Sequence, residues 1–151
     1  MHDAIVIALG SPVHVGVYDE NGRLTESIHS DGLGSDVLAL IFDDLLKKYR
    51  FNHLIYANGP GSFMGIKVAY LFLKTLCIVR NIPLLAVDGF FFNANHPIKA
   101  VGKLYFVKNS NTITMEPLEN PTLKGFELPQ TIDVKNFNTD SAPYYGIEAV
   151  G

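Results

Sequence analysis

The sequence predicts an α/β fold in which helices pack on a mixed five-stranded sheet, followed by a reduced second lobe. Two observations predict this class. The first thirty residues contain three short segments of strand length, either apolar or alternating. Two longer segments with apolar residues at helical spacing follow, and each leads into another short apolar run. Such alternation is typical of parallel strands joined through helices.

The composition suits one domain, or one domain with a small appendage. Of the 151 residues, 48% are hydrophobic, which is enough for a substantial core and excludes a disordered chain. The formal net charge is −3. That charge disfavours direct binding of a nucleic-acid backbone by this chain alone, because such binding takes a cluster of Lys and Arg.

The sequence also predicts a compartment. The most apolar segment is interrupted by Lys67, Lys74 and Arg80, so we expect no membrane span. The chain begins Met1-His2-Asp3 without a basic signal region, and the cytoplasm is therefore expected. The single cysteine, Cys77, lies inside a helical apolar pattern and is interpreted as a small buried filler.

The first thirty residues are expected to form an antiparallel meander of three strands. Residues 4–9 are a continuous apolar run, typical of a central strand. Residues 13–18 alternate, and residues 23–29 are more polar, which indicates an edge. The Asn-Gly pair within residues 19–22 suits the positive φ values of a hairpin turn.

Two helices and two further strands complete the sheet. Apolar residues recur at helical spacing over 36–50, and a second helix follows the glycine-rich loop and ends at Arg80. Residues 53–57 and 84–87 are short buried strands, which right-handed crossovers would make parallel neighbours of the first strand. The resulting order, β-β-β-α-β-α-β, is that of ribonuclease-H-like and actin-like ATPase (ASKHA) domains.

The character of the chain changes after Asp88. We divide it into an N-terminal lobe, residues 1–95, and a reduced, irregular, β-rich lobe, residues 96–151. Prolines beyond Glu116 break any long element there. The elements expected after residue 88 are a short helix at 89–92, a strand pair or bent strand at 99–107, a strand at 112–115 and a short strand at 131–134.

The glycine-rich loop Asn58 to Gly65 invites a phosphate-binding interpretation. It lacks the Gly-Lys-Ser/Thr of a phosphate loop, and its glycines do not have dinucleotide-binding spacing. Ser62 is not a nucleophile elbow, because Pro60 and Met64 occupy the places of the required glycines. A tight strand-to-helix turn with close packing is favoured.

Other candidate sites are weak. In actin-like ATPases the first hairpin cradles phosphates, and a carboxylate ending the first strand helps hold the metal; Ala8 and Leu9 occupy that place here. Gly10 and Ser11 are weak candidates for contact with an anion, and a plain turn is favoured. The five histidines are scattered singly, so neither a metal site nor a catalytic residue is predicted.

The second helix is more apolar than a sheet alone requires. One stripe can cover the sheet: Ile66, Ala69, Leu73 and Leu76. Further apolar positions face elsewhere, and the polar, proline-broken tail is a poor cover for them. We therefore predict a helical interface with another protein. Its expected residues are Val37, Leu40, Ile41, Asp44, Val68, Phe72 and Val79.

A family resemblance rests on the glycine turn. The segment GPGSFMGIKVAYLFLKTL, residues 59–76, resembles the GPGSFTGxR signature and following helix of the TsaB (YeaZ) family. The similarity extends over residues 4–87 in strand order and hairpin position. The chain resembles a shortened, divergent member, since Met64 and Lys67 replace the signature Thr and Arg and the usual Asp-Thr-Ser after the first strand is absent. The signature turn comprises Gly59, Pro60, Gly61, Ser62, Phe63 and Gly65.

This resemblance implies an actin-like fold and a non-catalytic scaffold role in making threonylcarbamoyladenosine (t6A) on tRNA. In the family, TsaB binds TsaD, whose own site transfers the threonylcarbamoyl group, and the ATPase TsaE joins them. The contact with TsaD is built from the first two helices of each protein, and TsaB alone can form a homodimer. ATP, ADP and metal are accordingly expected on the partners, and tRNA is contacted only indirectly.

Two other classes of function stay open, an enzyme of one of two kinds and a homodimeric regulator. A small actin-like phosphotransferase would need acids placed for magnesium, and a glycoprotease-like metallopeptidase would need paired histidines. A homodimeric regulator with another partner would use the same apolar helices. Calorimetry with Mg-ATP would separate the enzymes from the scaffold.

Overall fold

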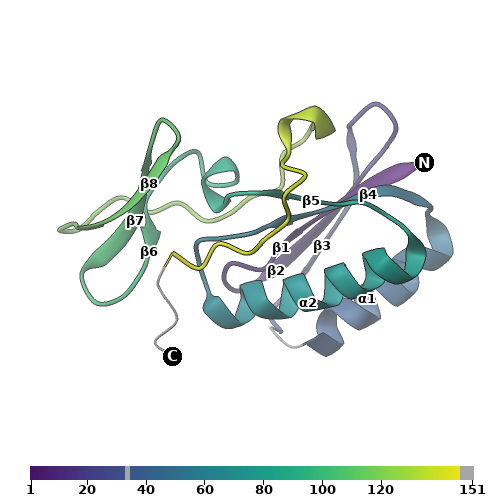
Figure 1. Ribbon diagram of the computed structural model, residues 1–151, viewed down its shortest axis with the longest axis horizontal. Helices are drawn as coiled ribbons and strands as arrows, with labels where there is room; N and C mark the ends of the chain where they lie inside the picture. The colour runs from purple at the N-terminus through teal and green to yellow at the C-terminus, as the bar shows by residue number, and fades with distance from the viewer. Residues whose placement is uncertain (33–34, 147–151) are drawn as a thin grey trace.

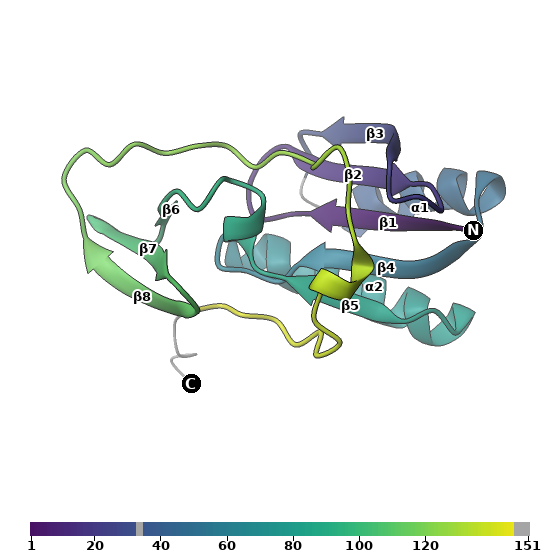
Figure 2. The same ribbon diagram turned by 90° about the horizontal axis from the view of Figure 1, so that it is seen from above.

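The computed structural model describes residues 1–32 and 35–146, and Figures 1 and 2 show it from two directions. Its centre is a five-stranded sheet in the order β3-β2-β1-β4-β5. The predicted mixed α/β sheet is confirmed. Both helices, α1 and α2, lie on one face of this sheet (Figure 1). The elements are β1 His2–Ile7, β2 Val13–Tyr18, β3 Leu24–Ser30, α1 Ser35–Lys48, β4 Phe51–Ala57, α2 Phe63–Arg80 and β5 Leu84–Val87.

The pairing corrects one detail of the expected topology. β1 pairs antiparallel with β2 and parallel with β4, so both of its edges are occupied. β5 pairs with β4 and is parallel to it. The prediction that residues 84–87 would directly neighbour the first strand is therefore wrong, because the second crossover continues outward past β4.

The boundaries of β1 and α2 shift for a local reason. The first strand was expected to end at Leu9, but β1 ends at Ile7. Ala8 and Leu9 remain buried beneath the glycine turn instead of extending the strand. α2 begins at Phe63 because the Ser62 side chain accepts a hydrogen bond from Gly65 N at 3.1 Å and caps the helix.

Apolar layers cover both faces of the sheet. The helix-side layer packs Leu38, Phe42 and Leu73 against β2 and β4. The opposite layer is formed by Ile5, Ile7 and Ile55 of the strands together with side chains from the C-terminal segment. Alternation along each strand sends neighbouring residues to different layers, which is why the central strands are apolar throughout.

Residues 118–146 form a long strap that returns to the five-stranded sheet (Figure 2). The strap covers the sheet face opposite the helices, where Phe126, Leu128 and Phe137 pack. It then passes the edge of β5, where Asn138 N donates to Ala86 O at 2.7 Å and Ala86 N donates to Asn138 O at 2.9 Å. The irregular tail of the sequence is thus the second cover of the sheet.

The short strand expected at 131–134 is largely wrong. Thr131 makes an isolated bridge to Arg23, and Val134–Asn136 form a 3-10 turn. The Asp133 side chain accepts from Lys135 N and holds the chain in that turn.

The second lobe is a three-stranded antiparallel sheet in the order β6-β7-β8. Its strands are β6 Ile98–Lys99, β7 Leu104–Asn109 and β8 Thr112–Pro117. A 3-10 turn, η1 (Gly89–Phe91), stands where the short helix was expected. Phe90, Ile98 and Phe106 form a small core at the junction, so side chains from both sides of residue 95 share it. The division between residues 95 and 96 stays a prediction.

Candidate partner-binding face and interlobe cleft

The outward surface of α2 carries large apolar side chains that are open to solvent. Met64, Leu71 and Ile78 recur every two helical turns and are 60%, 55% and 70% exposed. Val79 is 74% exposed, as is Leu40 on α1. We call these five residues the outer stripe. Their spacing on α2 is that of a helix seam that packs against another helix.

The structure divides the predicted interface residues into two groups. Leu40, Asp44 and Val79 are exposed, and Asp44 forms an ion pair with Lys48 at 3.1 Å. The others are half-buried: Val37, Ile41, Val68 and Phe72.

Phe72 illustrates the second group. Its ring lies 5.8 Å from that of Phe42, so it contributes to packing of the helices on the sheet as well as to the surface between them. The predicted sheet-facing stripe of α2 is similar but not identical to the observed one, since Cys77 is buried and Leu76 is only partly covered.

Three residues of the outer stripe were missed by the sequence interpretation. Met64, Leu71 and Ile78 follow a seven-residue repeat that is readable from the sequence. Their signal is a second apolar repeat on α2, in addition to the one that faces the sheet. The sequence interpretation named Phe72, the neighbour of Leu71, and the contact of Phe72 with a partner stays a prediction.

The glycines of the signature turn allow α2 to pass close to the end of β1. A Cβ on Gly65 would lie 2.1 Å from Ala8 O, and one on Gly61 would lie 2.8 Å from Leu9 O. Gly59 has φ +126° and a Cβ there would meet Tyr144 O at 1.8 Å. Ser62 N donates to Leu9 O at 2.9 Å, which ties the turn to β1. The turn therefore fixes where α2 starts.

Phe63 and Pro60 complete the signature turn. Pro60 is buried, and the Phe63 ring stacks on Tyr145 of the strap at 4.4 Å. Gly10 and Ser11, the weak anion-binding candidates, lie in the loop after β1, where Ser11 Oγ donates to Asp31 O at 3.3 Å. Their role toward an anion stays a prediction.

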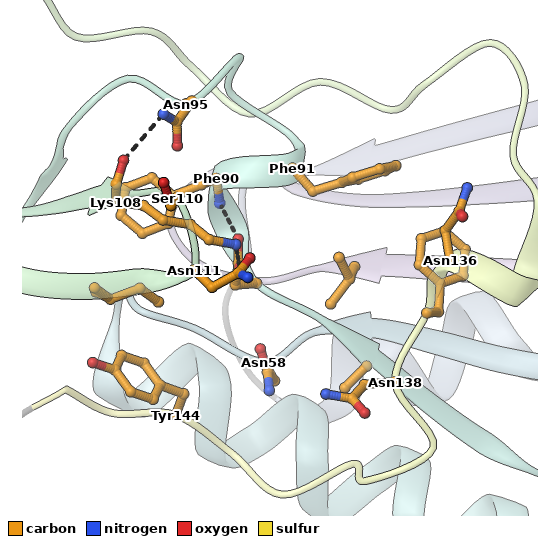
Figure 3. A pocket seen from close by; sticks show the side chains of 15 residues that line it. Asn58, Phe90, Phe91, Asn95, Lys108, Ser110, Asn111, Asn136, Asn138 and Tyr144 are labelled. Atoms are coloured by element: carbon orange, nitrogen blue, oxygen red, sulfur yellow. Dashed lines mark hydrogen bonds and ion pairs between the residues drawn. The ribbon is translucent and has the colours of Figure 1, made fainter.

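A polar cleft of about 820 Å³ lies between the five-stranded sheet and the small lobe (Figure 3). Its walls come from the carboxyl ends of β4 and β5, the turn η1, the β7–β8 hairpin and the strap. Lys108 on β7 and Asp88 after β5 form an ion pair across it. Asp88 also accepts from Phe90 N at 3.0 Å and so caps η1. Other side chains also line the cleft, among them Asn58, Phe91, Asn111, Asn138 and Tyr144.

Buried hydroxyl and thiol groups have structural roles. Burial raises the pKa of Tyr18 and of Tyr56, and their hydroxyls donate to strap carbonyls at Pro129 (2.7 Å) and Ser141 (2.5 Å). Burial also raises the pKa of the Cys77 thiol to about 11. A thiol with so high a pKa is a poor nucleophile at neutral pH, which agrees with its interpretation as a filler.

Residues 1–32 and 35–146 contain neither a helix suited to cross a membrane nor a cluster of metal-ligating side chains. In that part of the chain, neither helix has the length and apolar character of a bilayer span. His, Cys, Asp and Glu side chains also do not gather there into a group of three that could ligate a metal ion.

Comparison with solved structures identifies the fold class of the chain. No protein-family model matches the chain, and no curated protein matches it. Among solved structures, YeaZ from Pseudomonas aeruginosa is similar with a TM-score of 0.66 and 17% identity, over 81% of this chain and 69% of that one. An uncharacterized protein with similarity to peptidase YeaZ from Pseudomonas aeruginosa gives a TM-score of 0.62 and 16% identity, over the same shares. The chain therefore has the actin-like, ribonuclease-H-like fold of the YeaZ structures, as its element order and its GPGSF turn predicted.

Proposed function

We propose that this chain is a non-catalytic scaffold of the TsaB type, which binds a TsaD-like protein, with a TsaE-like ATPase joining them, in t6A modification of tRNA. The observation that carries the proposal is the outer stripe on α1 and α2. The YeaZ-like fold and the GPGSF turn support it. In this role ATP, ADP and metal belong to the partners, and the compartment is the cytoplasm.

The outer stripe has the chemistry of an interface core. Burying one Leu, Ile or Met side chain stabilises an association by about 1.5–3 kcal/mol. Charged side chains lie beside the stripe on α1: Asp43 pairs with Lys47 at 3.3 Å and Asp44 with Lys48 at 3.1 Å. An apolar centre with a charged rim is typical of protein–protein interfaces.

The geometry of the two helices favours a helical partner. Met64, Leu71 and Ile78 form one seam along α2, and α1 lies beside α2 on the same sheet face (Figure 1). Two helices of a partner could pack on this pair to form an intermolecular bundle. The close approach of Gly65 and Gly61 to the chain after β1 sets the position of α2, so the seam is already placed in the free chain.

Co-purification with the TsaD-like protein of the same organism tests the proposal. We expect a complex whose native mass is the sum of the two chains. Leu71→Asp and Leu40→Asp should each weaken it by at least about 10-fold, because a charge would be buried in the apolar centre. Leu71 is a better test site than Phe72, since an aspartate at Phe72 would also disturb the contact with Phe42.

Val101→Asp is the matched control, because Val101 is a 59% exposed apolar residue of the small lobe. It should leave the complex intact. Wild-type affinity in both helix variants would rule out this face as the interface. A dimer of this chain that persists when the TsaD-like protein is added, with no mixed complex, would favour the homodimeric regulator, and tight stoichiometric Mg-ATP binding by the isolated chain would favour an enzyme.

A further inference from the structure

The interlobe cleft has the position and size of a small-molecule site. It lies outside the carboxyl ends of the parallel strands β4 and β5, where open α/β sheets bind ligands. Its volume of about 820 Å³ is within the range of ligand pockets, roughly 300–1,000 Å³. The outer stripe is on the helices, so this site is separate from the proposed interface.

The polar groups that line the cleft are mainly neutral amides. Five asparagines and one serine contribute to its wall, from both lobes and the strap: Asn58, Asn95, Ser110, Asn111, Asn136 and Asn138. Each asparagine offers two N–H donors and a carbonyl acceptor. Figure 3 shows Asn58, Asn111 and Asn138 around the same space. A ligand with several hydroxyl groups, each both donor and acceptor, matches this set.

Asn58 shows that the floor of the cleft has unused hydrogen-bonding capacity. Its Nδ2 donates to Ala142 O at 3.1 Å, which fixes the orientation of the amide. Its Oδ1 is shielded from solvent and has no hydrogen-bond partner among residues 1–32 and 35–146. A buried acceptor without a partner is costly. Because this oxygen has almost no exposed surface, a donor of a ligand reaches it only when the Asn58 side chain turns toward the cleft.

The charges in the cleft cancel. Among the described residues that line it, Lys108 and Asp88 carry the formal charges, and they form an ion pair with each other. A phosphate or carboxylate group would have to compete with Asp88 for the Lys108 ammonium. The cleft therefore favours a neutral ligand over an anionic one.

Aromatic rings at the rim supply an apolar surface. Phe91 is 45% exposed, and its ring lies 5.5 Å from that of Phe137, edge to face. Tyr144 on the strap is 36% exposed. The apolar CH face of a sugar ring packs well on such rings, and amides then bind its hydroxyls.

We propose that the interlobe cleft binds a neutral ligand built around a sugar ring, whose hydroxyls are bound by the asparagines and whose apolar face rests on Phe91 or Tyr144. The same chemistry is found in the ribosyl ring of a nucleoside and in a free saccharide. For a ligand of this size we expect a dissociation constant on the order of 1 mM or tighter.

The test is an amide NMR titration of the full chain with three probes: adenosine as the nucleoside, maltose as the saccharide, and ATP as the charged comparator. Saturable shifts at residues of the cleft with adenosine or maltose are expected, and the probe that binds identifies the source of the ring. Asn111→Ala and Asn138→Ala should each weaken binding about 5-fold or more. Asn52→Ala is the matched control, since Asn52 is an exposed asparagine at the far end of β4.

Three results would overturn the proposal: no saturable shift with either neutral probe, tighter binding of ATP than of adenosine, or unchanged binding in both cleft variants. None of them bears on co-purification with the TsaD-like protein, so failure here is distinguishable from failure of the proposed function.

Discussion

Gly65 shows how one residue position determines the course of a helix. A side chain there would lie 2.1 Å from Ala8 O, and the backbone carbonyl at the end of β1 cannot rotate away as a side chain could. The close approach sets the distance of α2 from the end of β1, and we expect it also to set the position of the outer stripe. The signature turn is thus a packing device, and the same device orients the outer stripe.

Gly65→Ala is expected to destabilise the protein by about 1–3 kcal/mol, because the overpacking at Ala8 outweighs the better helix propensity of alanine. Urea unfolding measures the free energy of unfolding. Gly125→Ala is the control, since a Cβ there would have no atom within 4 Å among the described residues. Equal stability of the two variants would contradict the packing account.

His14 and His29 form a cross-strand pair on β2 and β3, with ring centroids 5.6 Å apart. Burial, and secondarily the nearby His29, lowers the pKa of His14 below its ordinary 6.5. The unfolded chain then binds more protons than the native one between the lowered pKa and 6.5. Native stability is therefore complete above pH 6.5 and falls as the pH drops through that window.

Thermal unfolding at about pH 7.5 and about pH 5.5 measures this pH dependence. The melting temperature should fall on acidification in the wild type, and His14→Gln should reduce the fall because the titrating group is gone. His29→Gln should reduce it by less, since His29 is the smaller cause of the shift. An undiminished fall in His14→Gln would mean that other groups govern the acid response.

At the scale of elements, the strap is attached to the five-stranded sheet both by hydrogen bonds and by the packing of apolar side chains. The hydroxyls of Tyr18 and Tyr56, on the sheet, each donate a hydrogen bond to a backbone carbonyl of the strap. Backbone pairs at Ala86–Asn138 and from Ile132 N to Gly22 O add further links. The strap is held at both faces of the sheet, since Tyr18 packs in the layer under the strap and Tyr56 in the layer under the helices.

Tyr56→Phe removes the bond to Ser141 O and should cost about 0.5–1.5 kcal/mol locally. Hydrogen exchange followed by mass spectrometry should show faster exchange in residues 138–146, with α2 unchanged. Tyr49→Phe is the matched control, because the Tyr49 hydroxyl donates to Glu26 at 2.8 Å, away from the strap. If exchange in the strap were the same in both variants, Tyr56 would not anchor it.

For the whole molecule, local sequence patterns predicted the helices and strands of the five-stranded sheet, but they did not predict the path of the strap across that sheet. The alternation of β2, the helical spacing of α1 and the apolar run of β5 are each visible within a few neighbouring residues, so the positions of these elements follow from the sequence. The path of the strap depends on backbone groups such as Gln130 O meeting Leu24 N, which any residue type could supply. Proline-rich, polar composition carries no signal for such a path.

The two candidate sites also differ in how far the sequence could predict them. Three residues of the outer stripe form a repeat within α2, so the sequence could indicate a second apolar face of that helix. The cleft is assembled from five separate segments, and its asparagines are far apart in the chain. Their convergence becomes visible only once the strap and the β7–β8 hairpin are placed (Figure 3).

The position of the strap late in the chain also determines when each apolar face of the sheet becomes covered during synthesis. By residue 87 all five strands and both helices have been made, and the helix side of the sheet can close. The other side, with Ile5, Ile7 and Ile55, gains Phe92 early but lacks most of its cover until residues 126–137 follow. At about 5–20 residues per second, the interval from residue 87 to residue 137 lasts about 3–10 s. We therefore expect the nascent chain to expose part of an apolar sheet surface during that interval, and a chaperone that binds apolar segments at the ribosome should raise its yield.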